Sequence, residues 1–276
     1  MPVYYGRGTP IEPGAFPAIL AIGDSWFWYP LPTGYNLLQQ LSDRVLNPGY
    51  TSILSLGYVG AKIEDYVEGK FAEDFQNELK PVNARYYSAV LISGAGNDAV
   101  DYSLALQRTC AGIGSPGRCF DEANFDGLMR KLSGWLGRMI HDIRWAWRGE
   151  PAERHPHVFI HCYDYAPPNG KGARLAGIPL PFGPWLKPAM DRAQVRDDPV
   201  FRQAVVRLLI DRIHDTLAQY DDDARRVHLV DSRGCLDGAS DWDNELHPNS
   251  KGFEKLATGP WRAALAKYGF AKLSTG

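Results

Sequence analysis

The amino-acid sequence predicts a three-layer α/β fold built on a parallel sheet, and three observations support this. Short apolar runs alternate with longer amphipathic segments, which is the order of βαβ crossover units. The apolar runs are nearly continuous, as in strands that are covered on both faces. The composition, 45% hydrophobic and 22% charged among 276 residues, is typical of a globular domain.

Five apolar runs are predicted as strands, and most end in glycine, aspartate or another turn residue. They are residues 18–23, 52–57, 88–94, 157–163 and 226–231. Apolar side chains recurring at three- and four-residue steps predict two amphipathic helices, at residues 125–147 and 201–217. Weaker helical patterns cover residues 35–45, 63–79 and 250–267.

The chain contains no internal repeat and no convincing linker, so a single domain over residues 1–276 is predicted. Segments 99–124 and 165–198 break the rhythm of strands and helices, and the second is rich in proline and glycine. Both follow the carboxyl ends of predicted strands, the edge where open parallel sheets bind ligands. We therefore expect them to form walls or lids of a pocket, with plain surface loops as the alternative.

Charge and hydropathy restrict the class of protein. The net charge of −2, from 30 basic and 32 acidic residues, argues against a general nucleic-acid binder. No apolar run is long enough to span a bilayer. The N-terminus as it stands lacks the pattern of a signal peptide, so cytoplasmic localisation is the default and another secretion route stays open. The oligomeric state is left open.

Cysteine and histidine residues predict no metal site. The four cysteines include no C-x-x-C pair, which disfavours zinc. Cys110 and Cys119 bracket a glycine- and proline-containing loop, and a disulfide or two free thiols are both compatible with this spacing. His157 and His161 lie about 13 Å apart along a strand, too far for one ion, and with His155 they are expected to be surface or hydrogen-bonded histidines.

Four short motifs lie at the carboxyl edge of the predicted sheet. They read "GDS" with Ser25, "GYVGAK" with Gly57 and Gly60, "GAGND" with Asn97, and "DWDNELHPNS" with His247. Each has an ordinary explanation alone, such as a helix N-cap at Ser25, turn glycines, or an Asx turn at Asn97. Their occurrence together and in this order is specific.

This ordered set resembles the SGNH hydrolases, the GDSL-type esterases and lipases, from about residue 18 to the last helix. The resemblance implies a flavodoxin-like sandwich with five parallel strands, a nucleophilic Ser25 and a general base His247. It implies an oxyanion hole formed by the N–H groups of Ser25 and Gly60 and the side-chain amide of Asn97. A small-molecule ester is the expected partner, and no cofactor or metal is needed. Gly57 is expected to be only a turn glycine, and Asp24 is expected to shape the turn.

These residue types suit acyl transfer. A serine hydroxyl needs a neutral imidazole to take its proton, and the oxygen of the attacked carbonyl needs donors that already face it. The family usually places aspartate three residues before the histidine, but this chain has Asn244 there. Asp241 or Asp243 is the expected substitute. A backbone or amide oxygen orienting His247 and a weak or inactive site remain alternatives. Glu245 is a fourth possibility, although a residue two positions from His247 is expected to point away.

Aromatic residues around the nucleophile predict an apolar substrate pocket formed by Trp26, Phe27, Trp28 and Trp185. Such walls suit an acyl or aryl group, so an esterase or lipase is the leading hypothesis. They also stack on sugars, so a carbohydrate or peptidoglycan O-deacetylase is the alternative. A binding module without catalysis also stays open, whereas the aromatics after Ser25 disfavour a phosphate-binding loop and therefore a nucleotide binder.

Overall fold

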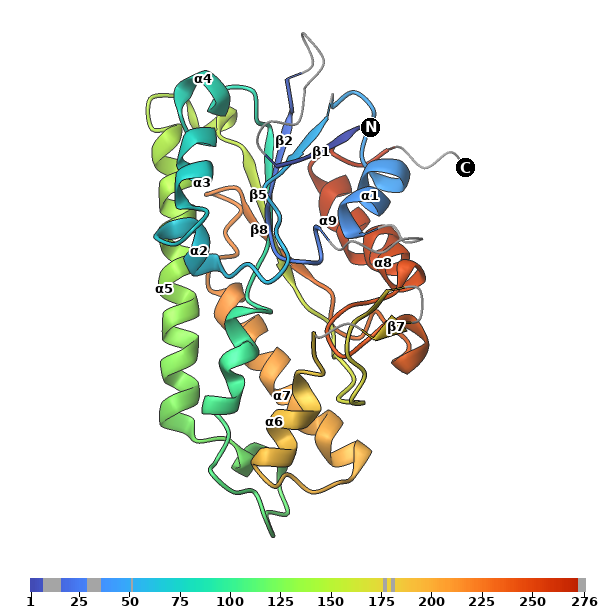
Figure 1. Cartoon of the computed structure of the whole chain (residues 1–276). Coiled ribbons are helices and arrows are strands. Elements are labelled where there is room, and N and C mark those ends of the chain that lie inside the picture. The colour runs from blue at the N-terminus through green and yellow to red at the C-terminus, as the bar shows by residue number, and fades with distance from the viewer. Residues whose placement is uncertain (7–15, 29–35, 51, 176–177, 180–181, 273–276) are drawn as a thin grey trace.

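A parallel sheet forms the centre of the computed structural model, which describes residues 1–6, 16–28, 36–50, 52–175, 178–179 and 182–272 (Figure 1). The strands of this sheet are β1 Val3–Tyr5, β2 Ile19–Gly23, β3 Ile53–Ser55, β4 Ala89–Ser93, β5 His157–Cys162 and β8 Val227–Asp231. Across the sheet they are ordered β1-β3-β2-β4-β5-β8, and every neighbouring pair is parallel.

The strand order defines where a ligand site belongs. Without β1, the order is the 2-1-3-4-5 arrangement of flavodoxin-like folds. Its switch point lies between β2 and β4, where Gly23 is paired with Ser93 and both strands end at the same edge. Crevices outside the carboxyl ends of strands at such a point bind ligands. The motifs with Ser25 and Asn97 directly follow these two strands.

The prediction of five strands was one short. The sixth strand, β1, has only three residues, half-buried, and pairs with β3 at the edge of the sheet. A run this short carries no recognisable hydrophobic pattern, and its pairing with a distant strand creates it. The five predicted strands all occur, with ends shifted by up to two residues.

Helices cover both faces of the sheet, giving the predicted three-layer α/β/α sandwich (Figure 1). One face carries α1 Leu37–Gln40, α8 Ser250–Leu256 and α9 Arg262–Lys267, and the other carries α2 Ile63–Val67, α3 Ala72–Glu78, α4 Pro81–Ala84, α5 Glu122–Ala146 and α7 Pro199–Ala218. The two strongest periodic segments thus form the long helices α5 and α7. One π-helical segment, Leu41–Val45, continues α1, and another, Ala257–Trp261, joins α8 to α9.

The two irregular segments contain more regular structure than expected. Residues 99–124 include 3₁₀ turns that cover Asp98–Leu104 and Pro116–Cys119. Residues 165–198 include a short antiparallel pair, β6 Arg174–Leu175 with β7 Ile178–Pro179, and the helix α6 Leu186–Arg192. Helix α6 and the start of α7 lie in the lower part of Figure 1, beyond the carboxyl ends of the strands, and the rest of α7 runs back toward the sheet. The segments therefore extend the molecule on the side of the candidate site.

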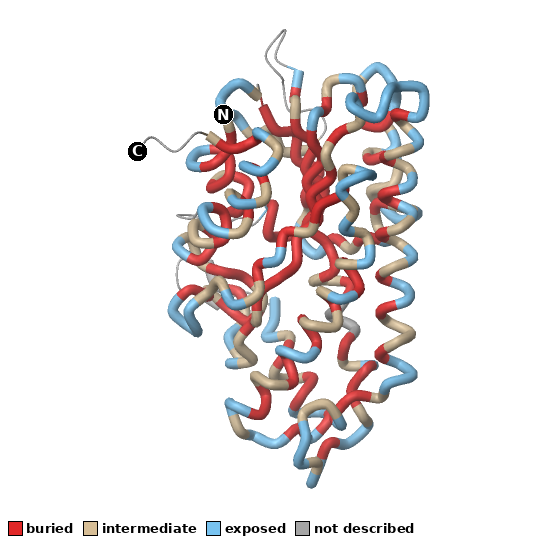
Figure 2. Tube along the Cα trace, turned by 180° about the vertical axis from the view of Figure 1, so that it is seen from behind, coloured by how far each residue is buried: buried red, intermediate tan, exposed pale blue. Residues whose placement is uncertain are grey.

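The hydrophobic core follows the sheet. Figure 2 shows buried residues along the strands and on the helix faces turned toward them. Cys110 and Cys119 are buried free thiols, so the structure has no disulfide at this pair. None of the helices in the described part of the chain is long and apolar enough to cross a membrane.

Candidate active site

The turn that carries Ser25 begins where β2 ends, at Gly23. A Cβ at this position would overlap the carbonyl oxygen of Ser93 on β4, so glycine is needed where the two strands approach. The Asp24 carboxylate accepts a hydrogen bond from the backbone N–H of Trp26 (3.0 Å), which closes a tight turn around Ser25. The turn-shaping role expected of Asp24 agrees with this contact, and Ser25 comes to lie at the switch point.

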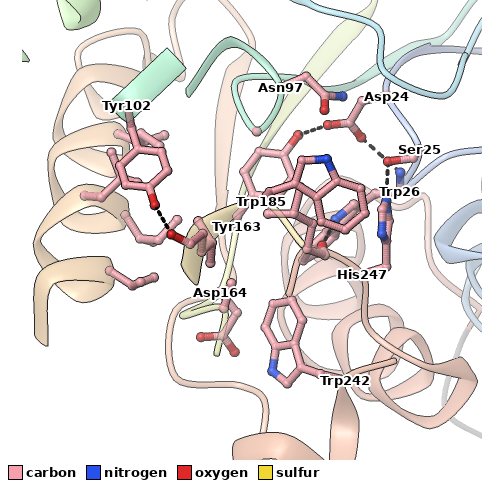
Figure 3. A pocket seen from close by; sticks show the side chains of 18 residues that line it. Asp24, Ser25, Trp26, Asn97, Tyr102, Tyr163, Asp164, Trp185, Trp242 and His247 are labelled. Carbon is pink, nitrogen blue, oxygen red and sulfur yellow. Dashed lines mark hydrogen bonds between the residues drawn. The ribbon is translucent and has the colours of Figure 1, made fainter. Parts of the chain in front are cut away.

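Ser25 and His247 are brought together across 222 positions of the sequence. Ser25 Oγ lies 2.6 Å from His247 Nε2, and both residues are buried with 5% of their surface exposed. Figure 3 shows the two side chains facing each other at one end of a cavity. His247 reaches this place from the loop between β8 and α8. A hydroxyl and an imidazole at this distance have the geometry of a nucleophile and its base.

Asn244 orients the imidazole. Its Oδ1 lies 3.0 Å from His247 Nδ1 and also accepts hydrogen bonds from the backbone N–H groups of Leu246 (2.9 Å) and His247 (3.0 Å). Because a backbone N–H only donates, the side-chain atom that faces both groups is the oxygen. This oxygen can only accept from Nδ1–H, so the histidine proton is on Nδ1. The lone pair of Nε2 is then directed at the Ser25 hydroxyl.

The structure differs from the expectation that Asp241 or Asp243 replaces the missing acid. Asp241 is fully buried and accepts hydrogen bonds from Lys255 Nζ (2.7 Å) and the backbone N–H of Asp237 (2.7 Å). Asp243 is linked to the imidazole through Asn244, because Asp243 Oδ2 accepts a hydrogen bond from Asn244 Nδ2 (3.2 Å). The contact with Asp243 holds the amide of Asn244 in the orientation that its backbone contacts require.

Glu245 points away from His247, as expected, but it serves a structural purpose that the sequence did not reveal. Its carboxylate is fully buried and accepts four backbone N–H hydrogen bonds from the 165–198 segment. The donors are Gly170 (2.8 Å), Trp185 (2.6 Å), Leu186 (2.7 Å) and Lys187 (3.0 Å). Glu245 therefore fastens the start of α6 to the loop that carries His247.

Asn97 lies beside Ser25 in the cavity wall. Its Nδ2 donates to the carbonyl oxygen of Ala61 (3.0 Å), which fixes the side chain and leaves its second amide hydrogen for another acceptor. No described residue accepts a hydrogen bond from the Ser25 N–H. Gly60 adopts a positive φ of 74° and is exposed outside the residues that line the cavity, so its oxyanion role stays a prediction. Gly57 packs closely against Phe27, as a turn glycine does.

Burial sets the electrostatics of the site. It lowers the pKa of His247 to about 3, because burial disfavours the charged imidazolium. Burial also raises the pKa of Asp24 to about 7, although hydrogen bonds from Tyr163 and the Trp26 backbone oppose this shift. His247 is therefore neutral at physiological pH and able to accept the Ser25 proton. The imidazolium formed by that transfer faces an amide oxygen at Nδ1, where a carboxylate would stabilise its charge more strongly.

The cavity next to Ser25 has a volume of about 50 Å³. Its polar end is formed by Ser25, Asn97 and His247, whereas most of its remaining wall is apolar. Figure 3 shows this end on one side and a helix with aliphatic side chains on the other. The described residues contain no group of three histidine, cysteine, aspartate or glutamate side chains arranged to hold a metal ion.

Two of the four predicted pocket aromatics line this cavity. Trp26 does so while its Nε1 donates to the carbonyl oxygen of Leu246 (2.9 Å), and Trp185 presents its ring edge-on to His247, with 5.9 Å between ring centroids. The predictions for the other two differ from the structure. Phe27 is fully buried in the core near Trp261, and Trp28 is 37% exposed outside the cavity. The turn at Ser25 directs successive side chains to different sides.

The 99–124 and 165–198 segments both contribute to the cavity wall, as expected, but sequence reasoning did not single out the other residues that complete it. Tyr163, at the end of β5, donates a hydrogen bond to the Asp24 carboxylate, and Tyr102 lies in the 99–124 segment. Four aliphatic residues of α7 complete the wall: Val206, Leu209, Ile210 and Ile213. The apolar stripe of α7 was visible in the sequence. Such a stripe predicts that one helix face is buried, but the pattern does not distinguish a face that covers the sheet from a face that lines a cavity.

A three-layer α/β/α sandwich with flavodoxin-like strand order and a serine–histidine pair at its switch point is the class that this fold and site define. No protein-family model and no curated protein matches the sequence. Among solved structures, a lipase from a goat rumen metagenome matches with a TM-score of 0.55 and 15% identity, over 89% of this chain and 96% of that one. This nearly full-length match confirms the fold expected from the resemblance.

Two further structures align over most of the chain with TM-scores of 0.48. One is a phospholipase A1 from Streptomyces albidoflavus NA297, with 14% identity over 92% of this chain and 99% of that one. The other is a carbohydrate esterase family 3 protein from Talaromyces cellulolyticus, with 13% identity over 91% of this chain and 96% of that one.

Proposed function

We propose that this protein is a serine ester hydrolase of the SGNH type, which cleaves carboxylic esters through an acyl-enzyme on Ser25. The observation that carries the proposal is the 2.6 Å contact between Ser25 Oγ and His247 Nε2, with the proton of His247 held on Nδ1 by Asn244. A serine that only caps a helix has no need of a buried, oriented imidazole at hydrogen-bond distance.

In the first half-reaction, His247 Nε2 takes the hydroxyl proton while Ser25 Oγ attacks the ester carbonyl carbon. The carbonyl oxygen becomes negative and is stabilised by the Ser25 N–H and the free amide hydrogen of Asn97, with Gly60 as the third donor that the resemblance implies. The alcohol leaves when His247 donates the proton to its oxygen. Water then attacks the acyl-enzyme with His247 again as base, which releases the acid and restores Ser25.

With Asn244 as the partner of His247, we expect ester hydrolysis that is slower than in a site with aspartate at this position. In the serine-protease template, exchange of aspartate for asparagine costs about 10⁴-fold and leaves the imidazole in the wrong tautomer. Here the backbone contacts of Asn244 fix the correct tautomer. Only the charge of the carboxylate is missing, so the loss is smaller.

Labelling with a fluorophosphonate probe tests the proposal. We expect one covalent adduct by intact mass, located on Ser25 by peptide mapping, together with hydrolysis of short aryl esters. Ser25→Ala should abolish both while leaving the melting temperature nearly unchanged. Ser42→Ala is a matched control, because Ser42 is a buried serine on the π-helical segment after α1, outside the cavity. Folded protein without an adduct and without turnover would indicate a binding module instead.

A further inference from the structure

The cavity continues from the catalytic pair into an apolar space, which we name the α7 chamber. Its walls are formed by Tyr102, Leu186, Val206, Leu209, Ile210 and Ile213. All six residues are buried, and four of them come from one face of α7. The chamber therefore offers a ligand contact with buried aliphatic and aromatic side chains.

Two polar groups along this path are already engaged within the protein. The Tyr102 hydroxyl donates to the Leu186 carbonyl oxygen (2.6 Å), and Trp26 Nε1 donates to the Leu246 carbonyl oxygen (2.9 Å). A sugar that entered the chamber would bury hydroxyls without these partners, and each unsatisfied hydroxyl weakens binding.

Among the described residues of the wall, the only carboxylate besides Asp24 is that of Asp164, and it already accepts several hydrogen bonds. Asp164 accepts hydrogen bonds of 2.6 Å from the backbone N–H groups of Tyr165, Gly234 and Leu236. Burial raises the pKa of Asp164, which its three N–H contacts oppose. The carboxylate is thus tied to the fold and is not presented to a cationic or hydroxyl-bearing ligand. An aliphatic group is the ligand that fits the chamber.

We propose that the α7 chamber binds the acyl chain of the ester and sets the preferred chain length, an inference that rests on the proposed function. The acyl group stays bonded to Ser25 after the alcohol leaves, so an apolar chamber beside Ser25 suits the acyl group. The substrate class is then an ester of a fatty acid.

Burial of each methylene group in apolar surroundings contributes about 0.8 kcal/mol, which is about fourfold in kcat/KM. We expect kcat/KM to rise about fourfold per added acyl carbon until the chamber is full, and then to fall. Ile210→Trp should shift the optimum to shorter chains by filling the chamber. Ile210→Ala should shift it to longer chains, and this smaller substitution keeps the test valid where tryptophan prevents folding.

The assay uses two series of esters, p-nitrophenyl esters from acetate to dodecanoate and acetate esters of alcohols from ethanol to octanol. Leu208→Trp and Leu208→Ala are the matched controls, because Leu208 is 39% exposed on α7 outside the cavity. Melting temperatures are measured for all variants. We expect an optimum of acyl-chain length that shifts in the Ile210 variants and stays unchanged in the Leu208 variants.

Three outcomes overturn the proposal. The first is Ser25-dependent hydrolysis with no dependence on acyl length, or an optimum that ignores residue 210. The second is a length optimum in the alcohol series instead. The third is faster deacetylation of an acetylated xylo-oligosaccharide than of any longer-chain ester. In all three cases the fluorophosphonate adduct on Ser25 still forms. Loss of that adduct would instead refute the proposed function.

Discussion

Replacing Asn244 by aspartate would place a carboxylate at the atom that now accepts from His247 Nδ1. The single change also brings two carboxylates together, because Asn244 Nδ2 lies 3.2 Å from Asp243 Oδ2. The charge-conserving double variant Asp243→Asn/Asn244→Asp avoids this repulsion, because the amide introduced at position 243 can donate to the carboxylate introduced at position 244. We therefore take the double variant as the main test and expect the single variant to gain less.

The size of the effect follows from the missing charge. Unit charges about 4 Å apart interact by about 4 kcal/mol at an effective dielectric constant of about 20, and desolvation of the carboxylate reduces this. An adjacent opposite charge typically moves a pKa by about 1–3 units, so the pKa of His247 should rise from about 3 toward its ordinary range. Since one pKa unit equals about tenfold and the charge is only partly formed in the transition state, kcat should rise about 10- to 100-fold.

The assay is the pH dependence of kcat/KM for an aryl ester. His247 must be neutral to act as base, so activity is lost as the pH falls through its pKa. Raising that pKa moves the acid limb upward by about 1–3 pH units. Asn169→Asp, which adds the same charge in an exposed turn, is the control and should change neither quantity. An unchanged acid limb with an unchanged kcat in the double variant would refute the role of Asn244.

Three further predictions concern other parts of the structure. Asn97→Ala should lower kcat by about 10²–10³-fold with little change in KM, because one oxyanion donor is lost; a change confined to KM would contradict this. Burial lowers the pKa of His161 from 6.5 to about 3, so the unfolded chain binds a proton at a higher pH than the folded chain. The free energy of unfolding should therefore fall as the pH drops from about 6.5 to 3, and denaturant titrations should show a smaller pH dependence in His161→Leu. An equal pH dependence in the two proteins would count against this role of His161. Glu245→Ala leaves four backbone N–H donors, one buried and three partly buried, without their acceptor. It should lower the free energy of unfolding by about 3–5 kcal/mol, with faster proteolysis within residues 165–198. Unchanged stability would exclude the fastening role.

The sequence was sufficient for the fold and for the pair at its centre. Ser25, Asn97 and His247 belong to motifs that follow strand ends or precede the last helix, so their place was set by the order of elements in the chain. The sequence left the partner of His247 open between a substitute acid and an amide or backbone oxygen. Asn244 accepts from Nδ1 because two backbone N–H groups of a tight loop fix its amide, and such contacts exist only once the loop has formed.

The substrate pocket was predicted only in part, for a related reason. Consecutive residues in a turn point in directions that depend on the backbone angles, so Trp26 reaches the cavity while its neighbour Phe27 enters the core. The chamber wall depends on how far α7 extends beyond the sheet, which its apolar stripe does not specify. Strand β1 was missed because three residues at a sheet edge carry too little pattern.

The neighbouring positions of Asn244 and Glu245 link two parts of the chain. Asn244 accepts from His247, and Glu245 holds the start of α6 through backbone hydrogen bonds. We expect the two parts to open together. In hydrogen–deuterium exchange, the amides of Trp185 and Leu186 should exchange at the same rate as that of His247. Alignment of His247 and attachment of α6 beside the cavity would then be present together or lost together.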